Sequence, residues 1–337
     1  GKVLWRRRLA DDLESSPPPP KGSLYGMYQL PACFRLQMLA DGDLIVLGLH
    51  SWGDHARSES MKRWCRVYRL SPGGRLRWAF PQEGAMPLGL IHVDADPEGR
   101  RVAVLAASSA GNTPADLPFK PGSIYVLDGK TGELVGGHTF EPLKPHFEQV
   151  KFWLSVSVGP RGKLASLGMS DGRTFLVDLD RVEVAKTFTF GTPIMISGVP
   201  VSARSTFTHL APGSTAYFQT ANSTVPYASS ALHVAAPPGP HPWANTIHAV
   251  GPEGRVRWRY RSGHEYQGFW TSTDGRWLAT CVIKDDARTG RDAGAMLFDT
   301  RRKGGGSSKL VYYYRVEGKT FFHADLASDG SALAFAE

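Results

Sequence analysis

The sequence has no apolar run long enough to cross a membrane as a helix, and its first residues do not form a charged and then apolar leader. We therefore expect no membrane-spanning segment. Because the chain begins at Gly1 rather than at Met, we expect that a leader has been removed or that the chain is a piece of a longer protein.

Cysteine is scarce, and motifs for catalysis or metal binding are missing. Cys33, Cys65 and Cys281 form no CxxC pair, no CxxCH haem site and no zinc spacing. There is no GxSxG nucleophile elbow, and Cys65 falls in mid-strand, where an inert role is expected. The pairs His50 and His55, and His233 and His241, do not have the spacing of an HExxH metal clamp. We therefore predict no metal site and no cofactor, and we assign no catalytic residue.

Basic residues outnumber acidic ones, which gives a formal net charge of +8 at pH 7. This charge favours either an anionic partner or simple solubility. A nucleic-acid-binding protein usually gathers its positive charge with stacking aromatics on one face. Most basic residues here are scattered, so we expect no nucleic-acid partner.

Turn residues, in contrast, are abundant. The chain has 37 Gly and 24 Pro without a collagen-like period, and 42% hydrophobic residues, which is typical of many short strands joined by turns. Internal repeats explain this composition. Six turn glycines, each before a short apolar run, recur at intervals of 51 to 63 residues: Gly42, Gly99, Gly162, Gly213, Gly275 and Gly330. The sequence therefore predicts six copies of a hairpin.

A second hairpin follows each of the first five copies, at 66–80, 123–140, 173–188, 246–261 and 295–316. Two hairpins per repeat make a four-stranded antiparallel sheet, which is one blade of a β-propeller. We predict an all-β fold with a single domain over 1–337. This six-bladed β-propeller has blades at approximately 34–80, 88–140, 151–190, 200–262, 266–316, and 319–337 plus 1–9.

The last repeat contains a first hairpin, at 321–337, and no second one. Residues 1–9 repeat the Gly and Trp positions of 74–80 and 254–261. We therefore predict that they form the fourth strand of the last blade and close the ring, which removes free sheet edges. Since the third strand of that blade is absent, we expect a natural chain that continues beyond Glu337 or an incomplete last blade. If one disulfide forms, Cys33 with Cys65 is the favoured pair, because both fall in the first repeat.

The repeats also carry a resemblance. Their pattern is an aromatic strand, a polar turn, Gly, then Lys or Arg and Trp, and it resembles the repeats of bacterial PQQ-like propellers. That superfamily includes the quinoprotein dehydrogenases and outer-membrane assembly propellers. The turns Glu98-Gly99-Arg100 and Asp274-Gly275-Arg276 resemble those of bacterial WD40-like repeats. The resemblance implies the propeller fold. The chain has six countable blades, not the eight of quinoprotein dehydrogenases, and no vicinal cysteine pair, so we do not expect PQQ.

The long connections join second to third strands, or one blade to the next, and in an up-and-down sheet both kinds leave on the same side. Long loops on a rigid scaffold usually carry function. This long-loop face collects imidazoles and aromatic rings, for which we predict a binding surface; ordinary loop packing is the alternative for each residue. The candidates are His50, Trp52, His55, His146, Phe147, His241, Trp243, His264, Tyr266 and Trp270.

Two further patterns concern the fourth strands. Trp5, Trp78 and Trp258 each follow a turn glycine by four residues, and we predict that they fill the wedge between neighbouring blades. Alternation over 255–261 places four arginines on one side of an outer strand: Arg255, Arg257, Arg259 and Arg261. They either guard an exposed edge against pairing or form a docking strip for an acidic partner.

The expected function is that of a non-catalytic interaction or scaffold module, periplasmic or extracellular, that presents its long-loop face to a protein partner or to a small anionic ligand. The alternative is a propeller enzyme with His and Arg at the channel mouth. It would be quinoprotein-like, or similar to arylsulfate sulfotransferases, which share six blades and Gly-x-x-x-Trp strand ends. A subunit of a larger extracellular or redox complex is a third reading.

Overall fold

A computed structural model describes residues 2–13, 26–54, 62–108, 120–143, 152–196, 198–222, 240–283, 293–316 and 323–336. The chain divides into two compact units. The first contains Gly1–Glu141, Arg161–Lys163 and Asp178–Glu183, and the second contains Pro142–Pro160, Leu164–Val177 and Val184–Glu337. No helix among the described residues has the length and apolar character needed to cross a membrane.

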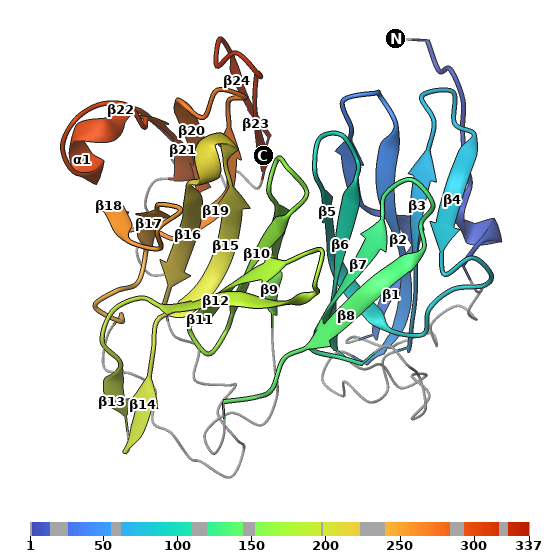
Figure 1. Ribbon diagram of the computed structural model, residues 1–337, viewed down its shortest axis with the longest axis horizontal. Coiled ribbons are helices and arrows are strands. Elements are labelled where there is room, and N and C mark those ends of the chain that lie inside the picture. Colours follow the sequence, from blue (N-terminus) through green and yellow to red (C-terminus); the bar gives the residue numbers. More distant parts are fainter. Residues whose placement is uncertain are drawn as a thin grey trace. The chain divides into compact units, whose positions relative to one another are not determined.

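The first unit contains two four-stranded antiparallel sheets, in which strands that follow one another along the chain are paired (Figure 1). A short 3-10 turn, η1 (Leu9–Asp11), precedes them. The first sheet consists of β1 (Gly26–Met38), β2 (Leu44–Asp54), β3 (Lys62–Leu70) and β4 (Leu76–Phe80). The second consists of β5 (Gly89–Ala95), β6 (Arg101–Ser108), β7 (Ser123–Asp128) and β8 (Leu134–Thr139).

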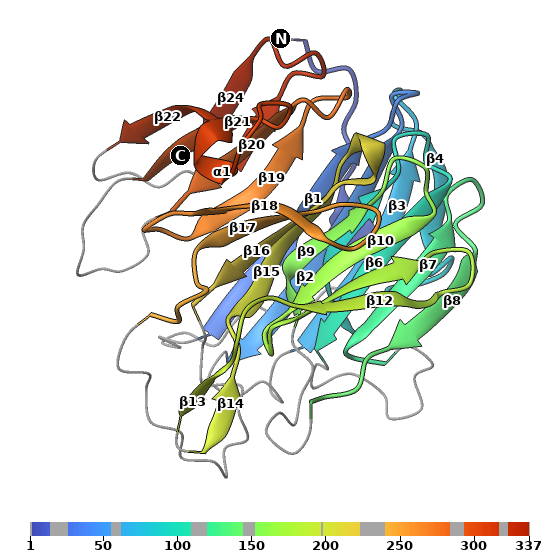
Figure 2. The same cartoon turned by 60° about the vertical axis from the view of Figure 1, so that its left-hand side comes forward.

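The second unit contains three more four-stranded sheets with the same sequential order (Figure 2). The third sheet, whose two turns belong to the first unit, consists of β9 (Phe152–Val158), β10 (Leu164–Met169), β11 (Arg173–Asp178) and β12 (Glu183–Thr189). The fourth consists of β15 (Arg204–Leu210), β16 (Ala216–Ala221), β17 (Thr246–Val250) and β18 (Val256–Arg261). The fifth consists of β19 (Tyr266–Thr271), β20 (Trp277–Val282), β21 (Ala293–Asp299) and β22 (Leu310–Val316).

The second unit also has two isolated hairpins and two short helical turns. The hairpins are β13 (Ile194–Ile196) with β14 (Val199–Val201), and β23 (His323–Leu326) with β24 (Leu333–Ala336). The helical turns are η3 (Pro212–Ser214) and α1 (Gly306–Lys309). The β13–β14 hairpin lies in a segment that we expected to be a plain connection between sheets.

The all-β class and the predicted repeats are confirmed at the level of sheets. Each of the six predicted turn glycines has a positive φ, between 62° and 81°, and five of the six repeats form four-stranded sheets. Glycine is required there because a Cβ disfavours this left-handed region. The expected start of the first blade at residue 34 was too late, since β1 begins at Gly26.

The predicted fourth strand at residues 1–9 does not form. Residues 2–8 belong to no strand, and β23 and β24 make a sheet of two strands. A fourth strand needs a third one beside it, and the described part of the chain has no third strand for that sheet. Ring closure therefore stays a prediction.

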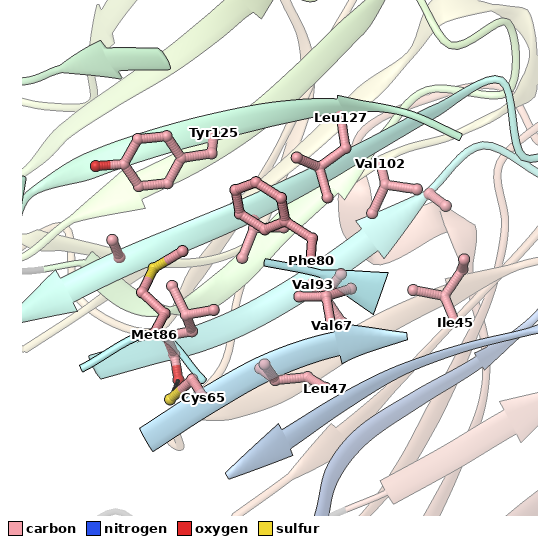
Figure 3. Close-up of a cluster of buried hydrophobic side chains, with 14 of the residues drawn as sticks. Ile45, Leu47, Cys65, Val67, Phe80, Met86, Val93, Val102, Tyr125 and Leu127 are labelled. Atoms are coloured by element: carbon pink, nitrogen blue, oxygen red, sulfur yellow. Dashed lines mark hydrogen bonds between the residues drawn. The ribbon is translucent and has the colours of Figure 1, made fainter. Parts of the chain in front are cut away.

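The core of the first unit lies between its two sheets. Apolar side chains from β2 and β3 meet those of β5, β6 and β7, and Figure 3 shows residues of this cluster, among them Leu47, Val67, Val102 and Leu127. These strands alternate between two faces, yet most of their residues are buried, as expected for strands inside stacked sheets. The apolar pattern thus fixes both the register and the packing partner.

The Cys33–Cys65 disulfide, which was the favoured pair if one formed, is absent, since Cys33, Cys65 and Cys281 are all free thiols. Cys33 on β1 pairs with Gly48, and Cys65 on β3 pairs with Leu49, so β2 runs between the two cysteines. Two strand spacings amount to roughly 10 Å, which exceeds the Cα separation of about 7 Å that a disulfide can bridge.

Polar side chains tie neighbouring sheets together at their first strands, which are edges. On β1, the Gln37 amide donates to the carbonyl of Ala95 on β5 and accepts from the N–H of Ala95, both at 2.7 Å. In the second unit, Ser155 Oγ on β9 accepts from the N–H of Thr208 on β15, at 2.8 Å. The edge amides of one sheet are thus satisfied by side chains of the preceding sheet.

The outer strands make a second repeated contact between sheets. The side chain four residues after one turn packs on the positive-φ residue of the corresponding turn in the next sheet. Trp78 of β4 lies on Gly132, where a Cβ would come within 2.6 Å of the indole, and Trp78 Nε1 donates to Gly129 O at 2.9 Å. Trp5 lies on Gly74 in the same way and donates to Pro72 O at 2.8 Å.

The same position recurs at the third and fourth sheets with other residues. Lys186 of β12 lies against Gly254. At the junction of the second and third sheets the large and the small residue exchange places. The strand residue is Gly136, and the turn residue is Val182, which fills the space despite its φ of 54°. The wedge role predicted for Trp78 is confirmed, and in each of these four contacts one partner is large and the other is small.

Candidate functional site

Three of the four arginines of 255–261, Arg257, Arg259 and Arg261, lie on β18, the outermost strand of the fourth sheet, and Arg255 comes directly before its first residue. β18 pairs only with β17, and Arg255, Arg257, Arg259 and Arg261 are exposed, whereas Trp258 is 8% exposed. The predicted alternation is therefore confirmed. We call these four arginines the basic strip.

Arg257 is paired within the protein. Its guanidinium lies 3.2 Å from the carboxylate of Glu253, and both side chains are about half exposed, so water and salt screen the pair strongly. Among the described residues, no carboxylate forms an ion pair with Arg255, Arg259 or Arg261. Three guanidiniums of the strip thus keep donors for another molecule.

Arg259 connects the strip to a group of buried rings. Its guanidinium carbon lies 4.9 Å from the centre of the Trp243 ring, which is a cation–π distance. Trp243 in turn lies flat on Gly191, whose φ is 82° and where any Cβ would overlap the indole. We call the group beside Arg259 the loop-end cluster; it consists of Phe190, Thr220, His241, Trp243 and His248.

His248 is the centre of the loop-end cluster and is fully buried. Its ring stacks on Phe190 with centres 4.2 Å apart, and its Nε2 lies 3.1 Å from Thr220 Oγ1. The Thr220 hydroxyl donates its proton to the carbonyl of Trp243. Oγ1 must therefore accept from Nε2–H, which leaves Nδ1 as the unprotonated nitrogen. Nδ1 has no hydrogen-bond partner among the described residues.

Burial, together with the positive charge of Arg259, lowers the pKa of His248 to about 3. The imidazole is therefore neutral at physiological pH. The cluster offers aromatic faces and neutral nitrogens, while the positive charge stays on the exposed strip.

His241 holds backbone segments together. Its Nδ1 accepts from the N–H of Trp243 at 3.1 Å, so Nε2 carries the proton and donates to Val201 O at 3.2 Å. Its own N–H donates to Asn222 Oδ1 at 2.9 Å. Burial lowers the pKa of His241, and the charge of Arg261 adds to this effect. His241 thus fastens the β16–β17 connection to β14.

The other residues predicted for the long-loop face have different surroundings. His50 is buried in β2 of the first unit, 5.3 Å from the ring of Trp64. Tyr266 belongs to the apolar core of the fourth and fifth sheets, and Trp270 packs beside Cys281 and Ala324. His264 is half-buried.

Trp52 lies in β2, and its side chain is outside the description. His55, His146 and Phe147 lie outside the described residues. The structure therefore brings His241 and Trp243 together with the strip, and it places His50 in the other unit. It adds Phe190, Thr220 and His248, which the sequence analysis did not select.

This arrangement supplies recognition groups. In the described ranges, no three His, Cys, Asp or Glu side chains gather as a potential metal site. Exposed guanidiniums beside an indole bind carboxylates through charge-assisted hydrogen bonds. No family model matches the chain, and no curated protein shows significant sequence similarity to it.

Proposed function

We propose that this chain is a six-bladed β-propeller that works as a non-catalytic interaction module, and that its basic strip docks an acidic protein segment. Two observations support the propeller: the six turn glycines with positive φ, and the sequential four-stranded sheets whose first and outer strands repeat the same contacts. One observation carries the docking function. Arg259 and Arg261 of β18 and the preceding Arg255 are exposed, and none of the three forms an ion pair with a carboxylate among the described residues.

The strip engages a partner through its side chains. The free backbone edge of β18 is covered near its middle, because α1 contacts β18 and the Gly306 backbone lies against the carbonyl of Arg259. An added strand would collide there, so pairing by strand addition is excluded at Arg259. Guanidiniums on alternate residues of a strand are roughly 7 Å apart, which suits carboxylates on alternate residues of an extended segment.

The described imidazoles of the loop-end cluster favour binding over catalysis. His241 and His248 have pKa values lowered by burial, and each is engaged by neighbouring backbone or hydroxyl groups. A general base or a nucleophile needs access to substrate and a pKa near the working pH. The cluster therefore serves as the support that orients Arg259 through Trp243.

The test is binding of a fluorescein-labelled peptide with alternating Glu and Ser residues, followed by anisotropy at 0.15 M NaCl. The triple variant Arg255→Gln/Arg259→Gln/Arg261→Gln should bind at least tenfold more weakly, since each lost charge-assisted hydrogen bond removes roughly 1.4 kcal/mol or more. The matched control is Arg6→Gln/Arg8→Gln/Arg75→Gln, which removes three other exposed arginines. It should change the affinity less than threefold.

Equal losses in both triple variants would show diffuse attraction by net charge and would refute a docking strip. Tighter binding of a single-stranded DNA oligonucleotide than of the peptide would refute an acidic protein partner. Circular dichroism melting of each variant verifies that the fold is retained.

A further inference from the structure

A basic cavity lies between the fourth and fifth sheets, at the junction that corresponds to Trp78 on Gly132. Here Trp258 of β18 is the large partner, and the β21–β22 connection is the turn that should cover it. This connection is extended to ten residues, 300–309, and contains α1. Gly304 has the expected positive φ of 99°, but a Cβ there would meet only Ser308. Trp258 therefore lacks the contact with a turn glycine that Trp78 makes with Gly132, and a cavity of about 280 Å³ lies there.

The cavity wall is strongly basic. Its lining includes four cationic side chains, Arg257, Arg302, Lys303 and Lys309, and no acidic one. Thr215 and Thr300 also line the cavity, and the Thr300 hydroxyl donates to the carbonyl of Gly275 at 2.8 Å. The residues thus concentrate positive charge and hydrogen-bond donors around a small space, which is a binding arrangement for an anion.

Lys309 is the buried member of this set, with 6% of its surface exposed. Its ammonium donates to the carbonyls of Thr300, at 2.8 Å, and of Arg302. It lies 6.0 Å from the Trp258 ring centre. Burial lowers the pKa of Lys309, and Asp299 compensates in part, although the Asp299 carboxylate already pairs with Arg276 at 3.1 Å. An anion in the cavity would supply the missing countercharge.

We propose that this cavity binds the phosphate group of a small organic phosphate or diphosphate. A phosphate carries close to two negative charges and three acceptor oxygens, so it can use several cations and a hydroxyl at once, whereas a carboxylate has only two oxygens. The buried ring of Trp258 gives one wall an apolar surface for the organic part. This site is separate from the proposed docking function, and the two share only Arg257.

The experiment is isothermal titration calorimetry of the whole chain with inorganic pyrophosphate, inorganic phosphate and phenyl phosphate at pH 7.5. We expect saturable binding of pyrophosphate that Lys303→Gln and Arg302→Gln each weaken about tenfold, because each removes one charge-assisted contact. Both residues are exposed, so neither substitution threatens the fold. Tighter binding of phenyl phosphate than of inorganic phosphate would identify an ester with an apolar substituent.

The matched control is Arg301→Gln. It removes the same charge from the adjacent position, but Arg301 pairs with Asp274 at 2.9 Å and does not line the cavity. We expect it to change the affinity less than twofold. An Arg301→Gln effect as large as that of Lys303→Gln, or no heat of binding for any of the three probes, would overturn the proposal.

A second comparison separates this site from the basic strip. Arg255→Gln/Arg259→Gln/Arg261→Gln should keep pyrophosphate binding within threefold, and Lys303→Gln should keep binding of the acidic peptide. If each variant abolished both activities, the two sites would be one, and the assignment of a separate phosphate cavity would be wrong.

Discussion

Replacement of His248 by Phe should remove a defined part of the acid sensitivity of this protein. The ordinary His pKa is 6.5, and in the folded chain the pKa of His248 is about 3. Between these two values the unfolded state binds one more proton than the folded state. Stability therefore falls as pH drops below 6.5, and the linkage for this residue amounts to about 2 kcal/mol at pH 5 and almost nothing at pH 7.5.

The assay is urea unfolding at pH 7.5 and at pH 5.0, with tryptophan fluorescence as the signal. In His248→Phe, the loss of unfolding free energy between the two pH values should be about 2 kcal/mol smaller than in the wild type. Each protein is compared with itself, so any direct cost of the substitution cancels. The Phe ring keeps the stack on Phe190, which lies 4.2 Å from His248.

Thr220→Val is the matched control for this experiment. It removes the hydroxyl that receives the Nε2–H of His248, so it should lower stability at both pH values by a similar amount, about 1–3 kcal/mol. The imidazole remains, and the pH difference of the wild type should remain with it. A His248→Phe protein that keeps the full wild-type difference would show that His248 is not neutral and buried in the folded state.

Two other predictions concern glycine and cysteine. In urea unfolding, Gly132→Ala should destabilise the first unit by about 1–3 kcal/mol more than Gly84→Ala. Both glycines have φ near 70°, but a Cβ at 132 would meet Trp78 at 2.6 Å, whereas one at 84 would meet nothing within 4 Å. Equal losses of unfolding free energy would contradict the packing of Trp78. In the native protein, a thiol reagent at pH 8 should label the exposed Cys33 and spare Cys65 and Cys281, because burial raises the pKa of both to about 12. In urea all three thiols should be labelled, which provides the control. Rapid labelling of Cys65 in the native protein would refute its burial.

The sequence predicted the sheets well because their determinants are local. A glycine such as Gly99 or Gly275 marks a turn through its own backbone conformation, and the alternation Arg257, Trp258, Arg259 separates the two faces of a strand without reference to any other element. The β13–β14 hairpin had a local signal too, since two short apolar runs flank Gly198, whose φ is 79°. Its short strands made it look like a connection.

The candidate site was harder to predict because its members depend on distant neighbours. His241 and Tyr266 are residue types that are common on binding faces. In the structure, however, His241 donates to the backbone of β14, and Tyr266 packs in an apolar core. His248 becomes a central residue only when Phe190, 58 positions earlier, stacks on it. The phosphate cavity did leave a signal: 301–309 reads RRKGGGSSK, a basic and unusually long connection where other repeats have short turns.

The exchange of sizes at Gly136 and Val182 has a consequence for anyone who recombines these repeats. Each of these contacts joins the outer strand of one sheet to a turn of the next. The large group lies on the outer strand at Trp78 but on the turn at Val182, so a sheet moved alone can meet a neighbour of the wrong size. If the third sheet were placed directly after the first, Val182 and Trp78 would compete for the same space. The second sheet would at the same time lose the contact of Gly136 with Val182. The exchangeable module therefore runs from one outer-strand turn to the next, across the boundary between two sheets.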